Sequence, residues 1–556
     1  MARVALALGV CDSGTPMRSG EARDETGRAA EGAAAAPTAP TAPTAPTAPT
    51  APTVAADTAR AAGRGGLALA GAKVAFMVYG FAQPLILLPL VGVPAYGQIS
   101  LVLSIVSIVN NVVVATSIQG VSRAVSSAPP GCEDQAFRAT LRIHVILAAA
   151  LALLFALGAG TIARFEKAPH VTAPLQLMAL VVLLYGVYAP LIGSLNGRRR
   201  FGTQAAFDTG YGAVRILALV LGAALFLRLG ASGVLGAFAG FVTAAALIVP
   251  LALGRAGTGR AGAGGPSARA YLAFLLPVAV AQIFLNLLMQ TDALLLRRFA
   301  GAVAGSTEAA DALQGVYKGA QQFSFLPYQL LLSVTFILFP LLARAHADGD
   351  RAAVRAYTMA GVRIALLATV LATGAIAGVA PHVLRTVFFH NAEMWEGGDA
   401  LRVLCLGMGS FSVLGITCAA LTSLGRARDS AALTLAGVIL VAASCSVVVP
   451  RAAFGPAMLV SSATATSIAL TLTAVAGGVR LRQVAGGFVA PLTVLRALLT
   501  LGICVVVGAR LPWLSKVGTV VEAAALGVLG LGLLIATGEI GREDLARIKQ
   551  VAGRKR

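Results

Sequence analysis

Residues 172–195 read TAPLQLMALVVLLYGVYAPLIGSL and contain no charged side chain. A helix rises about 1.5 Å per residue, so about twenty apolar residues cross a hydrocarbon core roughly 30 Å thick. This run is long enough, and similar runs recur along the chain from residue 67 onward. The sequence therefore predicts an all-α polytopic membrane protein.

The overall composition agrees with this class. Of the 556 residues, 57% are hydrophobic and 12% are charged, and the mean hydropathy is +0.83. Soluble domains carry about a quarter charged residues, so this chain has too little polar surface for a water-facing shell. The net charge of +20 would suit nucleic acid, but the basic residues lie mainly in short loops between apolar runs. We therefore expect contact with membrane lipids and no nucleic-acid partner.

Hydropathy predicts about fourteen membrane-spanning helices. The predicted spans are residues 67–91, 97–121, 141–162, 172–195, 207–228, 232–253, 271–296, 314–342, 359–388, 400–423, 431–449, 455–478, 491–510 and 517–537. Lys and Arg residues are concentrated in the loops on one side of these spans, together with both chain ends. Because cytoplasmic loops carry the excess of basic residues, we expect both termini in the cytoplasm.

A short motif recurs six spans apart and divides the chain into two halves. The sequence SLNGR at 194–198 follows the fourth span, and SLGR at 423–426 follows the tenth. Six is an even number, so the two halves would share one orientation in the membrane. The predicted units are an N-terminal six-helix bundle (67–253), a cytoplasmic linker (254–270), a C-terminal six-helix bundle (271–478), two extra helices (491–537) and a basic cytoplasmic tail (538–556).

Residues 1–60 differ from the rest of the chain. Within them, residues 36–53 repeat Ala-Pro-Thr, and a proline at every third position favours extended polyproline II over helix. Such a tract buries too little apolar surface to offset the entropy of ordering. We therefore predict a disordered cytoplasmic tail over residues 1–60.

Polar side chains inside apolar spans cost free energy and need a reason. In the eighth predicted span, five of them recur at helical spacing and share one face: Gln314, Lys318, Gln321, Gln322 and Gln329. The stripe would face either a neighbouring helix, through hydrogen bonds, or a water-filled cavity. Because the stripe includes a charge, we expect it to line a cavity. Pro327 and Pro340 in the same span predict kinks.

The seventh predicted span repeats this pattern. Gln282, Asn286 and Gln290 are four residues apart, and Asp292 follows them. Asp292 would either neutralise Lys318 or the arginines that follow it, or act as a simple carboxylate at the membrane interface.

Arg215 lies inside the fifth predicted span, too deep to reach the interface without snorkelling. Two interpretations are open. Arg215 either contacts an anion on the wall of a cavity, or forms a structural pair with Asp208, two turns earlier on the same helix face.

Motifs of catalysis and metal binding are absent from the sequence. No HExxH motif, no GxxxxGK[ST] loop and no CxxC pair occurs among the 556 residues. The predicted external loops are short, which argues against a membrane glycosyltransferase. We therefore expect a transporter rather than an enzyme, without cofactor, metal or catalytic residues.

Three stretches resemble the middle of the polysaccharide flippases. They are QTDALLL at 290–296, GVYKGA at 315–320 and TFILFPLLARAHADGD at 335–350. The sequence GEIGREDL at 538–545 is similar to the end of the same proteins. These flippases belong to the multidrug/oligosaccharidyl-lipid/polysaccharide exporter superfamily.

The resemblance implies two six-helix bundles around a V-shaped central cavity in a bacterial cytoplasmic (inner) membrane. It also implies alternating access, which would carry a polyprenyl-diphosphate-linked oligosaccharide of the O-antigen or capsule type to the outer leaflet. Lys318 and Arg215 would hold the diphosphate, and the Gln and Asn residues would bind sugar hydroxyls. A polysaccharide polymerase or glycosyltransferases would be partners.

Two alternatives within the superfamily stay open. Lipid II flippases of peptidoglycan synthesis place arginines on the first span, where this chain has Lys73 and no arginine. A cation-coupled multidrug exporter would favour acidic and aromatic residues in its cavity, which Asp292 alone clearly supports.

Overall fold

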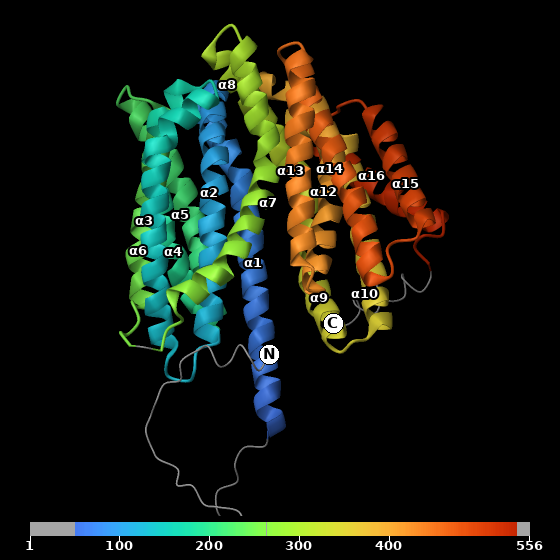
Figure 1. Cartoon of the computed structure of the whole chain (residues 1–556). Helices are drawn as coiled ribbons and strands as arrows, with labels where there is room; N and C mark the ends of the chain where they lie inside the picture. Colours follow the sequence, from blue (N-terminus) through green and yellow to red (C-terminus); the bar gives the residue numbers. More distant parts are fainter. Residues whose placement is uncertain (1–50, 263, 542–556) are drawn as a thin grey trace, which may run out of the picture.

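The computed structural model describes residues 51–262 and 264–541 (Figure 1). Every regular element in these two ranges is a helix. Of these helices, 13 are long and apolar enough to cross a membrane. The predicted class, an all-α polytopic membrane protein, is therefore confirmed.

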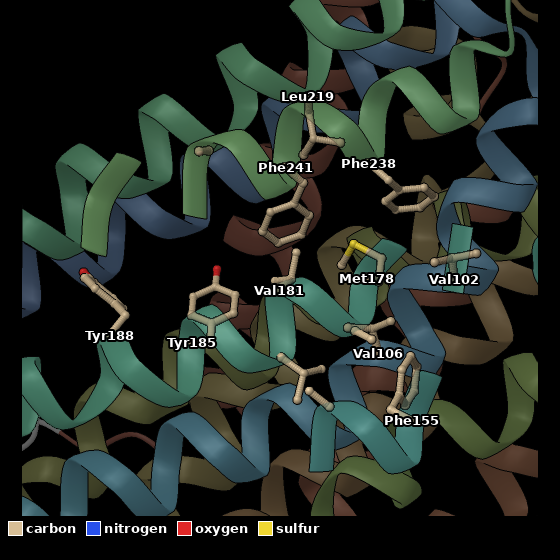
Figure 2. Packing of buried hydrophobic residues seen from close by; sticks show 14 of the residues in the cluster. Val102, Val106, Phe155, Met178, Val181, Tyr185, Tyr188, Leu219, Phe238 and Phe241 are labelled. Carbon is tan, nitrogen blue, oxygen red and sulfur yellow. The ribbon is translucent and has the colours of Figure 1, made fainter. Parts of the chain in front are cut away.

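The first six helices share one apolar core, and we call them the N-lobe. They are α1 (Ala51–Val91), α2 (Val93–Ser126), α3 (Glu133–Phe165), α4 (Thr172–Gly197), α5 (Phe201–Arg228) and α6 (Gly233–Ala256). Figure 2 shows part of this core, in which Met178 of α4 lies among Val106, Phe155 and Phe238 from three other helices. Side chains of α2 and α4 form much of the centre, and more than half of the apolar stretch of each is buried.

The next eight helices form a second group, which we call the C-lobe. They are α7 (Ala268–Val303), α8 (Thr307–Ser324), α9 (Leu326–Ala347), α10 (Arg351–Gly378), α11 (Ala380–Val387), α12 (Gly398–Ser423), α13 (Ala427–Val448) and α14 (Pro456–Ala485). The last two helices, α15 (Pro491–Ala509) and α16 (Lys516–Ala536), pack against α10 at the outer side of the C-lobe. Short 3-10 turns complete the fold: η2 (Pro169–Val171), η3 (Ala392–Gly397) and η4 (Val449–Arg451).

Helices α2, α7 and α8 make the principal contacts between the two lobes. We call the end of the molecule where α1 and α10 begin the lower end, and the end where α8 begins the upper end, as in Figure 1. At its lower end α7 packs on the N-lobe, where the Tyr271 hydroxyl lies 2.8 Å from His144 Nε2. At its upper end α7 packs on α8, α13 and α14 instead. Helix α7 therefore crosses from one lobe to the other.

The eighth predicted span is two helices rather than one. Helix α8 ends at Ser324 and α9 begins at Leu326, directly before Pro327, whose missing N–H is tolerated in the first turn of a helix. This break is the kink expected from Pro327, whereas α9 continues past residue 340. Neither α8, which carries most of the polar stripe, nor α9 is among the 13 apolar spans, so the predicted span 314–342 is the one that this count lacks.

The structure describes part of each predicted tail. Helix α1 begins at Ala51, so the prediction of disorder is wrong for residues 51–60. Pro52 is tolerated there because the first turn of a helix has no partner for its N–H groups. At the other end, Glu539 is buried and ion-paired with Arg363, so the start of the predicted tail is packed. Residues 1–50 and 542–556 lie outside the described residues.

Candidate functional site

A buried polar network joins α7 and α8. The Asp292 carboxylate accepts a hydrogen bond from the Tyr317 hydroxyl at 2.7 Å and from Gln321 Nε2 at 3.1 Å. Ser462 of α14 donates to the same Tyr317 hydroxyl at 3.4 Å. Asp292 is 1% exposed, so these donors replace the water that the carboxylate lost on burial. The interpretation of Asp292 as a simple interfacial carboxylate is therefore wrong.

Lys318 belongs to the same network. Its ammonium donates to Gln290 Oε1 at 2.9 Å and to Gln321 Oε1 at 2.6 Å. Gln321 thus binds Lys318 through its oxygen and Asp292 through its nitrogen, and this one amide couples the two opposite charges. The structure therefore favours neutralisation of Lys318 by Asp292, through Gln321.

The other polar residues of the seventh and eighth predicted spans make several different contacts. Asn286 accepts from Asn111 of α2 at 2.7 Å and donates to the Gln282 carbonyl at 2.8 Å, so it joins helices. Gln314 is buried, and neither polar atom of its side chain has a partner within the described chain. Gln322 lies next to α1, and Gln329 lies on α9 beyond the helix break. The stripe is therefore not one continuous surface.

Arg215 on α5 has aromatic neighbours instead of a carboxylate. Its guanidinium carbon lies 5.2 Å from the centre of the Phe76 ring of α1 and 5.5 Å from that of Phe241 of α6. The expected ion pair with Asp208 is not formed among the described residues, and Asp208 interacts electrostatically with Lys73. The structural-pair interpretation of Arg215 is therefore wrong.

Helix geometry places Arg215 on the inward face of α5. Leu217 and Leu221 are more than half exposed, and Leu217 is two residues away, which is about 200° around the helix. Tyr211 and Leu219, one turn before and after Arg215, are buried. Arg215 thus points away from the face that lipid would cover.

Two tyrosines, Tyr185 and Tyr211, interact with Arg215, and a third, Tyr188, packs against both of them. The ring of Tyr211 lies 5.7 Å from Tyr185 and 5.6 Å from Tyr188, measured between ring centres. Figure 2 shows Tyr185 and Tyr188 on α4 with their hydroxyls on the same side. The Tyr188 hydroxyl and Arg215 Nε are buried without a hydrogen-bond partner in the described chain, whereas Tyr185 interacts with both Tyr211 and Arg215. This cluster of donors has the chemistry to bind an anion.

A second charged cluster joins the lobes at the upper end. Arg297 of α7 and Asp311 of α8 are completely buried and paired, with Nε 2.8 Å from Oδ1. The other carboxylate oxygen accepts from Gln98 of α2 at 3.0 Å and lies 2.9 Å from His170 Nε2 of η2. Gly97 makes this approach possible, because a Cβ atom there would lie 1.7 Å from the Asp311 carbonyl oxygen. We call these five residues the upper lock.

Glu166 lies beside the upper lock, in the turn after α3. Burial raises the pKa of Glu166 to about 7, although the nearby Arg297 and Arg298 act to lower it. Its Oε2 atom has no hydrogen-bond partner in the described residues. The region around Arg297 therefore holds one carboxylate fixed by hydrogen bonds and another whose pKa is raised to about 7 by burial.

Comparison with protein families identifies the chain. Residues 135–527 match the family model described as "Lipid II flippase MurJ". The chain belongs to this family. No curated protein matches the sequence. The superfamily expected from the sequence is confirmed, whereas its polysaccharide-flippase branch is not.

Solved structures show the same fold as this MurJ family member. A lipid II flippase MurJ in an inward closed conformation has a TM-score of 0.64 at 12% identity, over 84% of this chain and 98% of that chain. An inward-facing MATE multidrug transporter of the MOP superfamily has a TM-score of 0.60 at 14% identity, over 74% and 94%. A MOP transporter from Pyrococcus furiosus gives 0.56 at 16%, over 75% and 95%.

Family and fold together define the class of activity. The chain is a multi-pass membrane protein of a flippase and transporter family, which supports transport rather than enzymatic chemistry. No group of three or more His, Cys, Asp or Glu residues that could hold a metal ion occurs in the part of the chain that the structure describes.

Proposed function

We propose that this protein flips a polyprenyl-diphosphate-linked saccharide across the bacterial cytoplasmic membrane by alternating access. The observation that carries the proposal is Arg215, a cation in the middle of a span without a carboxylate partner among the described residues. An uncompensated arginine costs about 2.5–3.5 kcal/mol at the centre of a membrane span. We therefore infer that Arg215 is present because the protein's function requires it. A diphosphate would supply the missing negative charge, because guanidinium binds phosphate oxygens in pairs.

Lys318 takes a different role in this proposal from the one we expected. Both amide acceptors of Lys318 belong to the network that also holds Asp292. We propose that this network positions α8 against α7, and that Arg215 contacts the cargo. The enclosed Asp292 also argues against a multidrug exporter, because its carboxylate is occupied and cannot meet a cationic drug.

Lipid II is the first candidate cargo, because the family model covers residues 135–527 and carries that name. An O-antigen or capsule-type repeat unit, with a polymerase or glycosyltransferases as partners, is the second candidate. This second candidate is favoured by the first span, Gly71–Val91, in which Lys73 is the one basic residue. Lipid II flippases would place arginines there. Both cargoes share the diphosphate that Arg215 would bind.

The upper lock fits the alternating-access part of the proposal. With the lower end cytoplasmic, as the basic loops predict, the paired Arg297 and Asp311 close the external side. Release of cargo to the outer leaflet would require α2 to separate from α8 there. The prenyl chain can remain in the lipid throughout, because it needs no polar surroundings.

Transport by the purified full-length protein tests this proposal. Proteoliposomes would contain fluorescent lipid II or a fluorescent undecaprenyl-diphosphate oligosaccharide, and a membrane-impermeant quencher would report the outer leaflet. We expect transfer of lipid II, and no transfer of a cationic dye used as the multidrug control. Transfer of the dye alone would refute the proposal, and transfer of the oligosaccharide alone would select the second cargo.

A further inference from the structure

A cavity of about 860 Å³ opens at the lower end of the C-lobe, remote from Arg215. It lies between the ends of α9, α12 and α14 and the start of α10. Its polar side chains are His346, Arg351, Arg355 and Gln483. Nothing in the proposed transport cycle uses this cavity.

The cavity concentrates positive charge. Three of its lining residues are basic, and no Asp or Glu side chain lines it. Neither Arg351 nor Arg355 forms an ion pair within the described ranges 51–262 and 264–541. The nearby Asp350 carboxylate caps α10, where its Oδ1 accepts a hydrogen bond from the Ala353 amide at 2.9 Å, and it does not line the cavity.

The two arginines stand where local helix energetics disfavours them. Arg351 and Arg355 occupy the first two turns of α10, at the positive end of the helix dipole, where acidic residues are preferred. An excess of basic residues in cytoplasmic loops would explain arginines at this end, but not their convergence on one cavity. Arg269 and Arg428, for example, are exposed at the same end and line no part of it.

The neighbouring loop fixes the position of Arg355. A Cβ atom at Gly487 would lie 2.8 Å from Arg355 Cγ, so the backbone at residue 487 lies close against the arginine stem. The stem is thereby supported while the residue stays exposed. Support of this kind lowers the entropy that the side chain loses when its guanidinium binds a ligand.

We propose that this cavity binds the phosphate group of an anionic phospholipid. It lies at the ends of membrane-spanning helices, which is the level of lipid headgroups. Basic pockets between helices on the cytoplasmic side are suited to such headgroups, and arginine binds phosphate in a bidentate manner. The volume of about 860 Å³ exceeds that of a single phosphate, so the glycerol part of a headgroup would have room beside it. The lower end of the C-lobe is thereby tied to the anionic leaflet.

Thermal unfolding of the full-length protein in nanodiscs tests the proposal. The nanodiscs contain phosphatidylcholine, with or without phosphatidylglycerol, and native mass spectrometry counts the retained lipid. We expect phosphatidylglycerol to raise the unfolding temperature of the wild type. The double variant Arg351→Gln/Arg355→Gln should lose at least half of this rise, while matching the wild type in pure phosphatidylcholine. The milder Arg355→Lys should retain most of it, which guards against a folding defect.

A charge-matched variant gives the control. Arg269→Gln/Arg428→Gln removes the same charge from the same end and should keep the full rise. Equal loss in both double variants would overturn the site and leave general attraction to the surface. In a third experiment, inorganic phosphate is added to the wild type in phosphatidylcholine nanodiscs, and the unfolding temperature is measured again. If phosphate alone reproduces the full rise, the ligand is a soluble phosphate and the assignment to a lipid is overturned.

Discussion

The guanidinium of Arg297 and the carboxylate of Asp311 form a completely buried ion pair between the end of α7 and the start of α8. Burial of two charges is costly, and it is tolerated here because Gln98 and His170 contact the second carboxylate oxygen. The pair therefore depends on the N-lobe, from which both of these residues come.

Removal of one member of this pair should destabilise the protein strongly. Arg297→Met leaves the buried Asp311 without its cation, and we expect a loss of about 3–5 kcal/mol. The double variant Arg297→Met/Asp311→Leu should recover much of it, since no unpaired charge remains. The free energy of unfolding in detergent, measured for the wild type, both single variants and the double variant as a double-mutant cycle, gives the loss and its recovery.

The exposed pair of Asp399 and Arg402 is the control for the buried one. Asp399 is largely exposed and lies on α12, so Asp399→Asn should cost less than about 1 kcal/mol. If the double variant Arg297→Met/Asp311→Leu were as unstable as Arg297→Met alone, our explanation would be contradicted. The side chains of Arg297 and Asp311 would then have a steric role.

Gly97 should tolerate no side chain. The Cβ of Gly97→Ala would lie 1.7 Å from a backbone oxygen of α8, so the two helices must separate. We expect a loss of about 1–3 kcal/mol from overpacking, and faster labelling of a cysteine placed near the upper lock. Gly527→Ala on α16 meets open space and should be neutral or stabilising by up to about 1 kcal/mol. Equal thermal stability of the two variants would argue against tight packing at Gly97.

The coupling of Lys318 with Asp292 predicts rescue. Lys318→Gln leaves the Asp292 carboxylate without its nearby cation, and we expect a loss of about 3 kcal/mol. Adding Asp292→Asn should restore most of the stability and, if Arg215 contacts the cargo, transport as well. Unfolding and flipping assays on the same preparations measure this. A stable but inactive Lys318→Gln protein that Asp292→Asn fails to rescue would instead make Lys318 the cargo contact.

Arg215 should show the opposite behaviour. Arg215→Gln removes an uncompensated charge, so stability should stay constant or rise, while transport falls at least about tenfold, equivalent to 1.4 kcal/mol. Arg215→Lys should be intermediate, because lysine keeps the charge but cannot bind phosphate in a bidentate manner. Arg228→Gln, at the exposed end of the same helix, should change neither property. Loss of folding in Arg215→Gln would show that the arginine is structural.

Glu539 predicts a pH dependence. Burial acts to raise the pKa of Glu539, but hydrogen bonds from Arg363, Thr493 and Arg496 outweigh it and hold the pKa below its ordinary value. A carboxyl group whose pKa is lower in the folded state stabilises the protein at pH values above its pKa in the unfolded state, which is about 4.3. This stabilisation is lost as the pH falls through the pKa of the folded state. The wild type should therefore exceed Glu539→Gln in stability at pH 7, and the difference should shrink as the pH falls below about 4.3. A difference in unfolding temperature that stays constant from pH 7 to well below this value would exclude linkage to Glu539.

Much of the fold was predictable because it depends on local composition. Runs such as residues 172–195 are apolar over the thickness of a bilayer, and lipid leaves helices as the simplest way to pair their backbone groups. The break before Pro327 was expected from the missing N–H of proline, although Pro84 and Pro190 lie inside continuous helices. The helix of residues 51–60 was missed because proline was counted as a helix breaker even at a first turn, where it is tolerated.

The candidate site was only partly predictable. Helical spacing placed Lys318 and Gln321 on one face, and Asp292 of the preceding span was named as a possible partner of Lys318; the three do share one network. The same spacing paired Arg215 with Asp208, although 7 residues separate them in the sequence and the structure does not bring them together. Periodicity shows which residues share a face, but not which neighbouring helix covers that face.

The sequence by itself determined that this chain spans a membrane, roughly where each helix lies, and that its helices carry buried polar residues. These properties follow from hydropathy, which acts residue by residue. Only the tertiary structure decided which charges are satisfied. Arg297 has Asp311, whereas Arg215 has aromatic rings and tyrosines, and no pattern along the chain distinguishes the two arginines. The physical reason is that a buried charge is governed by its nearest dipoles and counter-ions, and these come from helices distant in sequence.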